Sequence, residues 1–114
     1  MNRILFLSFA LTLTTLSTFA QSSDSKTPQE TAKTFTRQGD YTNAIVVLNG
    51  ALQKDPQNFE LQKDLSFNYY LDREFPKGLS VAQKMVERPD ADVQSYQILA
   101  LLYKAIDEIG RAHV

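Results

Sequence analysis

Two aspartates, Asp90 and Asp92, form a close acidic pair that could support acid–base or metal chemistry. Paired carboxylates can share a proton or bind a cation, but a calcium loop needs further oxygen ligands that the neighbouring residues do not supply. Helix capping explains the pair better, because Asp is favoured just before a helix. The only histidine is His113, which leaves a His-based triad or histidine metal site without a second candidate.

The other sequence signatures of chemistry are absent. There is no cysteine, no Gly-rich phosphate loop and no Gly-x-Ser-x-Gly elbow. Only Arg3 of the 12 basic residues precedes position 21, so the rest of the chain carries 11 basic and 13 acidic side chains, a net charge of −2. We therefore expect no enzyme activity, no cofactor, no metal and no nucleic-acid partner.

Residues 1–20 resemble an export signal. Arg3 and the amino terminus supply positive charge, Ile4–Leu16 is largely apolar, and Thr18–Ala20 offers small residues for cleavage between Ala20 and Gln21. The alternative, an uncleaved membrane anchor, is disfavoured because the apolar run is short and interrupted by threonines. The sequence predicts a periplasmic or extracellular protein that contacts a membrane only through its signal, before cleavage.

The stretch Gly39–Pro56 organises the rest of the chain, since it combines a turn, an amphipathic helix and a stop. Gly39 tolerates turn conformations, and the Asp40 carboxylate can cap the following helix. Pro56 blocks further helix. The apolar positions recur at helical spacing and comprise Ala44, Leu48, Ala51 and Leu52.

Capping and stop signals predict four further helices and no strand, so the fold class is all-α. After a flexible leader at 21–26, Thr27 and Glu30 form a capping box. Asn58 and Asp92 precede two other helices. The expected helices cover residues 28–38, 41–54, 59–72, 75–88 and 93–106, and the apolar stripe of the last comprises Tyr96, Leu99, Ala100 and Tyr103.

The same residue pattern recurs every 34 positions. Small residues stand where two helices of one unit must approach closely, as in the pairs Ala32 with Ala44 and Ser66 with Gly78. The matched sets are Thr31, Ala32 and Phe35; Leu65, Ser66 and Tyr69; Leu99, Ala100 and Tyr103; and, for the second helices, Tyr41 and Ala44 with Phe75 and Gly78.

This pattern resembles the tetratricopeptide repeat (TPR), whose 34-residue unit is a helix, a turn and a helix. The resemblance covers Ser25–Ile106 and implies a right-handed α-solenoid of antiparallel helix pairs. About two and a half repeats would follow the signal, at 27–58, 59–92 and 93–108. Pro28 and Thr31 depart from the family's usual large apolar residues, and Pro89 lies one place earlier in its repeat than Pro56 does.

The resemblance also implies a concave groove, lined by the first helix of each repeat, that binds a protein or peptide. Asp64 stands where the carboxylate-binding subclass uses Asn, so we expect a different ligand. Phe67 lies two residues from both Leu65 and Tyr69, which turns it away from the buried stripe. The expected groove residues are Lys63, Phe67, Tyr70, Leu71, Gln97, Leu101 and Lys104.

The C-terminal segment contains the first helix of a third repeat without its partner helix. We expect self-association through this uncapped edge. Residues 109–114 look like the translation of a sequencing adapter and are expected to be a non-native tail, with the native sequence ending near Asp107 or Glu108 and continuing in the intact protein. The alternative is a natural frayed tail.

Two functions remain open at this point. The first is an exported scaffold that mediates protein–protein or protein–peptide interaction through its groove. The second is the regulatory or substrate-presenting N-terminal module of a longer exported enzyme. Further 34-residue units downstream would favour the scaffold, whereas downstream His, Ser or metal-ligand constellations would favour the enzyme.

Overall fold

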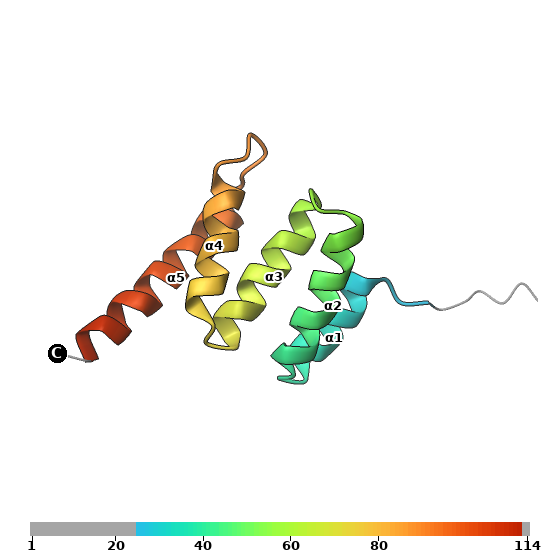
Figure 1. Cartoon of the computed structure of the whole chain (residues 1–114), viewed down its shortest axis with the longest axis horizontal. Helices are drawn as coiled ribbons and strands as arrows, with labels where there is room; N and C mark the ends of the chain where they lie inside the picture. The colour runs from blue at the N-terminus through green and yellow to red at the C-terminus, as the bar shows by residue number, and fades with distance from the viewer. Residues whose placement is uncertain (1–24, 113–114) are drawn as a thin grey trace, which may run out of the picture.

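The computed structural model describes residues 25–112, and this part of the chain contains five α-helices and no strand. The helices are α1 (Pro28–Arg37), α2 (Tyr41–Lys54), α3 (Phe59–Leu71), α4 (Phe75–Val86) and α5 (Val93–Ala112) (Figure 1). The predicted all-α class is confirmed. The export signal, residues 21–24 of the leader and His113 lie outside the described residues. None of the described helices is long and apolar enough to cross a bilayer.

Local side-chain caps begin four of the helices, as the sequence predicts. Thr27 Oγ1 accepts a hydrogen bond from the backbone N–H of Glu30 at 3.2 Å, and Glu30 Oε2 accepts one from the backbone N–H of Thr27 at 2.9 Å. Asp40, Asn58 and Asp92 cap α2, α3 and α5 by accepting from the backbone N–H three residues on. Each cap satisfies an amide that has no partner inside its helix.

The ends of the helices agree less well with expectation. Helix α5 continues to Ala112, so its predicted end at Ile106 is wrong, and most of the expected tail is helical. No proline interrupts α5, and Arg111 pairs with Asp107 one turn earlier, at 3.1 Å. The α1, α3 and α4 helices end one or two residues before their predicted ends.

Two turns of the chain are alike and 34 residues apart. The backbone N–H of Asp40 donates to Phe35 O, and that of Glu74 donates to Tyr69 O, both at 2.9 Å. The residue before each donor has a positive φ, 74° at Gly39 and 61° at Arg73. Arg73 therefore adopts the left-handed backbone conformation that glycine adopts without strain. The turn requires this conformation because it reverses the chain so that α4 can pack against α3.

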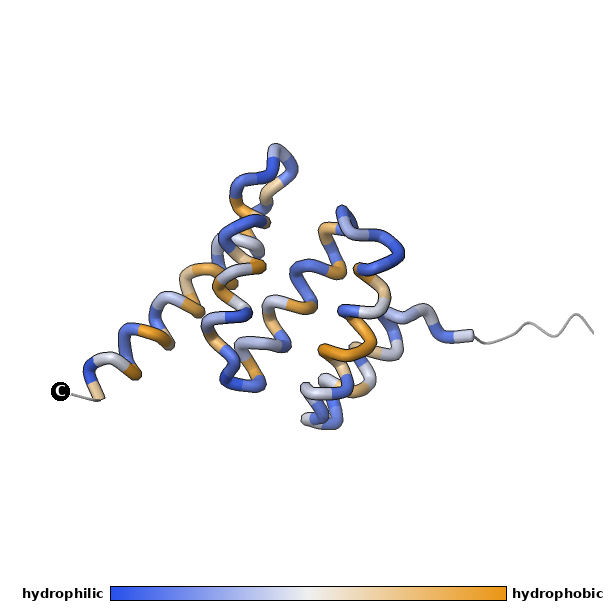
Figure 2. Tube along the Cα trace, viewed as in Figure 1, coloured by the Kyte–Doolittle hydropathy of each residue, from blue (hydrophilic) through white to orange (hydrophobic). Residues whose placement is uncertain are grey.

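Each helix packs against the next along the chain, and α3 also contacts α5 (Figure 1). The connections between α2 and α3 and between α4 and α5 are mostly hydrophilic (Figure 2). The apolar side chains between the helices form two clusters. The buried members of the first are Ala32, Ala44, Ile45, Leu48, Leu61 and Leu65, and those of the second are Phe75, Ala82, Met85, Ile98 and Leu102.

Small residues allow α3 and α4 to approach closely, as expected. Ser66 and Gly78 are both buried, and Ser66 Oγ donates to the carbonyl oxygen of Gly78 at 2.9 Å. A Cβ atom on Gly78 would lie 2.8 Å from Cδ2 of Leu102 and 3.1 Å from Cβ of Tyr69. Ala32 and Ala44 are likewise fully buried in the α1–α2 pair. The glycine at 78 is therefore required by packing on three sides.

Candidate functional site

An aromatic row runs along the C-terminal half of α3 and ends at an exposed ring. Phe67 stacks on Tyr70, with ring centroids 6.0 Å apart and planes 17° apart, and Tyr70 contacts Phe75 at 5.9 Å. Phe75 is buried in the core, Tyr70 is half-buried, and Phe67 is 38% exposed. The row therefore holds Phe67 in place from the core outwards while leaving its ring accessible.

Beside Phe67 lies a pocket between α1 and α3, with a volume of about 290 Å³. We call it the α1–α3 pocket. Its lining residues come from one face of each helix and are Ala32, Lys33, Thr36, Arg37, Asp64, Phe67 and Asn68.

The polar groups deep in the α1–α3 pocket hydrogen-bond to one another. Thr36 Oγ1 donates to Asn68 Oδ1 at 2.8 Å, and Asn68 Nδ2 donates to the carbonyl oxygen of Asp64 at 2.8 Å. Asn68 is only 3% exposed, so these bonds hold its amide rigidly. The Asp64 carboxylate accepts from Gln29 Nε2 at 3.0 Å. The chemistry left open to a ligand is that of Lys33, Arg37 and the Phe67 ring.

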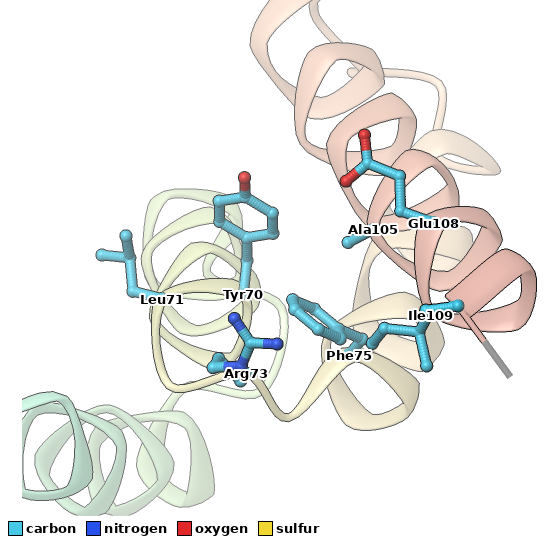
Figure 3. Close-up of a pocket in the computed structure, with 8 residues that line it drawn as sticks. Tyr70, Leu71, Arg73, Phe75, Ala105, Glu108 and Ile109 are labelled. Carbon is cyan, nitrogen blue, oxygen red and sulfur yellow. The ribbon is translucent and has the colours of Figure 1, made fainter.

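A second hollow, of about 530 Å³, separates α3 from the C-terminal half of α5. Tyr70 and Arg73 lie on its α3 side, Glu108 and Ile109 lie on its α5 side, and Phe75 lies between them (Figure 3). We call it the α3–α5 cleft. Leu71 also borders it, although its side chain points to the other side of α3 (Figure 3).

The remaining predicted groove residues lie on α5. Gln97, Leu101 and Lys104 are exposed and, with Ala100, line a shallow depression of about 410 Å³ on the helix surface. Leu101 is 37% exposed. Apart from Lys63, the predicted residues thus divide among these three hollows, none of which brings together the predicted residues of α3 and α5.

Lys63 does not belong to this surface, which corrects the prediction for that residue. It is only 5% exposed, and its Nζ lies 2.8 Å from both Glu60 Oε1 and Asp92 Oδ2. It also lies 4.9 Å from the centre of the Phe59 ring. Burial lowers the pKa of Lys63, but its hydrogen bonds to Asp92 and Glu60 outweigh burial and raise the pKa above its ordinary value. Lys63 therefore ties α3 to the start of α5.

The aspartate pair is explained by structure in the same region. The Asp90 carboxylate accepts two hydrogen bonds from Arg88, at 2.7 and 2.8 Å, which lower its pKa. Asp92 caps α5, and its pKa is lowered first by the hydrogen bond from Lys63 and then by that from the Ser95 backbone. Among residues 25–112, no three acidic, histidine or cysteine side chains are grouped closely enough to hold a metal ion.

Replacing Asp92 with asparagine is expected to destabilise the protein at about pH 7 and to have little effect at about pH 2.5. Asparagine caps a helix as well as aspartate does, so the substitution removes only the negative charge, which faces both Lys63 and the positive end of the α5 dipole. A carboxylate with a lowered folded pKa contributes stability above its ordinary pKa of about 3.9, and this contribution is lost as the pH falls through the folded value. Urea unfolding of both proteins at each pH measures the difference. An equal difference at the two pH values would contradict the charge explanation.

The sequence interpretation missed the α1 side of the surface. Lys33, Thr36 and Arg37 lie 34 positions before Phe67, Tyr70 and Leu71, so the repeat offset alone could have found them. Arg73 and Glu108 line the α3–α5 cleft, and no sequence pattern predicts them. Their positions are set by the turn after α3 and by the length of α5.

One face of α5 is apolar and uncovered in the described part of the chain. Tyr96 and Tyr103 are 54% and 50% exposed, and Leu99 between them is half-buried. The hydroxyl groups of both tyrosines are hydrogen-bonded. Gln83 Nε2 donates to the Tyr103 hydroxyl at 2.9 Å, and the Tyr96 hydroxyl donates to the Val86 carbonyl oxygen at 3.4 Å. The stripe predicted to lack a covering helix is the exposed one.

The described part of the chain is all-α, and its hollows are lined by aromatic and basic side chains from α1, α3, α5 and the junction between α3 and α4. Comparisons with protein-family models, curated proteins and solved structures found no match.

Proposed function

We propose that this protein is an exported TPR-like scaffold that binds a protein or peptide segment on the face formed by α1, α3 and α5. The observation that carries the proposal is the exposed Phe67 ring, fixed by Tyr70 between two hollows. A rigid, accessible aromatic ring gives a large contact area at a low entropic cost. An enzyme would need a cluster of reactive groups, whereas the acidic pair at Asp90 and Asp92 serves capping and pairing.

The TPR-like architecture, a right-handed solenoid of about two and a half repeats, is part of the same proposal. Three features support it: the identical hydrogen bonds that follow α1 and α3, the positive φ at Gly39 and Arg73, and the starts of α2 and α4 at Tyr41 and Phe75. Each pair of positions is separated by 34 residues. Export follows from the signal-like residues 1–20, with cleavage between Ala20 and Gln21.

Selection of peptides from a random displayed library on immobilised protein, residues 25–114, tests the binding function. We expect enriched peptides whose binding to the protein is lost when Phe67 is replaced by alanine. Enrichment that is the same on the Phe67→Ala protein, or no enrichment at all, would refute the proposal. Circular dichroism of both proteins checks that they are equally folded.

The uncovered face of α5 supports a further expected result, self-association of the chain through this edge. Two copies that pack Tyr96, Leu99 and Tyr103 against each other would remove these side chains from water, with Ala100 allowing close approach. Sedimentation equilibrium is expected to show concentration-dependent dimers that disappear when Tyr96 and Tyr103 are both replaced by lysine. A strictly monomeric wild-type protein with a sharp thermal transition would contradict this expectation.

A further inference from the structure

The α1–α3 pocket has a cationic rim. Lys33 and Arg37 are separated by one helical turn on α1, so both side chains border the same pocket. Both are exposed, and within residues 25–112 neither lies within salt-bridge distance of a carboxylate. Other surface bases of the chain are neutralised, since Lys77, Arg88 and Arg111 each pair with a nearby acid, at 3.0, 2.7 and 3.1 Å.

The one acid in the α1–α3 pocket does not neutralise this rim. The Asp64 carboxylate accepts its hydrogen bond from the neutral amide of Gln29 on α1, and it forms no ion pair with Lys33 or Arg37. The pocket therefore carries two positive charges against one negative charge. Its remaining walls are the Ala32 methyl group, the Thr36 side chain, the Phe67 ring and the buried Asn68 amide.

The surrounding surface has the same sign of charge. Over the α1–α3 pocket, the α3–α5 cleft and the α5 depression, the lining residues include four bases and two acids, a net charge of +2. The chain after residue 20 has a net charge of −2. A local potential opposite to that of the rest of the protein steers acidic partners towards this face.

We infer that the α1–α3 pocket binds an acidic side chain of an extended partner segment, paired with Lys33 and Arg37, while a neighbouring apolar side chain of that segment contacts Phe67. This inference rests on the proposed binding function and names the chemistry of its partner. The Arg37 guanidinium can form a bidentate pair with a carboxylate, and the Lys33 ammonium adds a second positive charge. The Phe67 ring supplies the apolar contact. In an extended segment, side chains two positions apart point to the same side.

The test compares two short fluorescein-labelled peptides of repeating sequence Glu-Ser-Leu-Ser and Lys-Ser-Leu-Ser, in which the charged side chain and leucine lie two positions apart and so point to the same side. Fluorescence anisotropy is expected to show tighter binding of the acidic peptide, with a preference that weakens as salt rises from about 0.05 to 0.3 M. In the double variant Lys33→Glu with Arg37→Glu, the acidic peptide should bind at least about tenfold more weakly. The matched control is Lys54→Glu with Lys84→Glu, which makes the same change of charge on exposed positions of α2 and α4 and should keep the preference.

Three outcomes overturn the inference: equal binding of the two peptides, an equal loss in the control variant, and binding of an oligothymidylate as tight as that of the acidic peptide. If Phe67→Ala weakens both peptides while the charge reversal changes nothing, the acidic preference fails and the binding function stands. If neither peptide binds and the library selection also yields nothing, both fail. The single variant Arg37→Glu gives the same comparison should the double variant not fold.

Discussion

Replacing Gly78 with valine is expected to lower the free energy of unfolding by about 3 kcal/mol. The first side-chain atom alone would lie 2.8 Å from Leu102 Cδ2, 3.1 Å from Tyr69 Cβ and 3.2 Å from the Ser66 carbonyl oxygen. The Leu102 side chain can rotate, but Leu102 is fully buried, and the Ser66 oxygen belongs to the backbone of α3. The α3–α4 pair must therefore separate, which also breaks the hydrogen bond from Ser66 Oγ to Gly78 O.

Gly50 provides the matched control for this experiment. It lies inside α2, as Gly78 lies inside α4, but nothing stands within 4 Å of the Cβ it would gain. Gly50→Val should change stability by less than about 0.5 kcal/mol, because valine and glycine differ little in helix propensity. Urea unfolding followed by circular dichroism measures both variants. Equal effects at the two positions would show that α3 and α4 are not held in the close contact described.

Replacing Phe67 and Tyr70 together with alanine is expected to weaken binding of the selected peptides by at least roughly tenfold, or about 1.4 kcal/mol. The two rings supply the exposed aromatic surface between the α1–α3 pocket and the α3–α5 cleft. Truncating an aromatic residue at the centre of an interface commonly has an effect of this size.

The contact of Tyr70 with Phe75 requires a separate measurement of stability. Removing the Tyr70 ring uncovers part of the core and should cost about 1 kcal/mol, whereas Phe67→Ala should leave the melting temperature almost unchanged. Val46→Ala is the control, because Val46 is 63% exposed on α2, away from the aromatic row. Normal binding by the folded Phe67→Ala protein would show that this ring only packs against its neighbours.

The agreement between sequence and structure is greatest where the controlling interactions are local. The caps at Thr27, Asp40, Asn58 and Asp92 were predictable because each side chain bonds to an amide three residues away. The turn at Gly39 was predictable for a similar reason. The end of α5 was not, because no proline or helix cap marks it and its last turns depend on weak local preferences.

The candidate site was predictable only in part. Helical geometry alone turns Phe67 away from the Leu65 stripe, and its ring is exposed as expected. The same reasoning failed for Lys63, because the side chains that hold it come from Glu60 on its own helix and Asp92 at the start of α5. A long flexible side chain such as that of Lys63 can turn towards opposite charges and an aromatic ring nearby. The position of a residue on its helix does not predict these partners.

The sequence by itself determined the helical class, the places where helices begin and the need for small residues at 66 and 78, since all three follow from contacts within a few residues or from a regular spacing. Only the tertiary structure decided which side chains share a hollow. The α1–α3 pocket joins Lys33 and Arg37 to Phe67 across about a third of the described chain. Its existence depends on how closely α1 and α3 approach, which the packing of both helices against α2 controls.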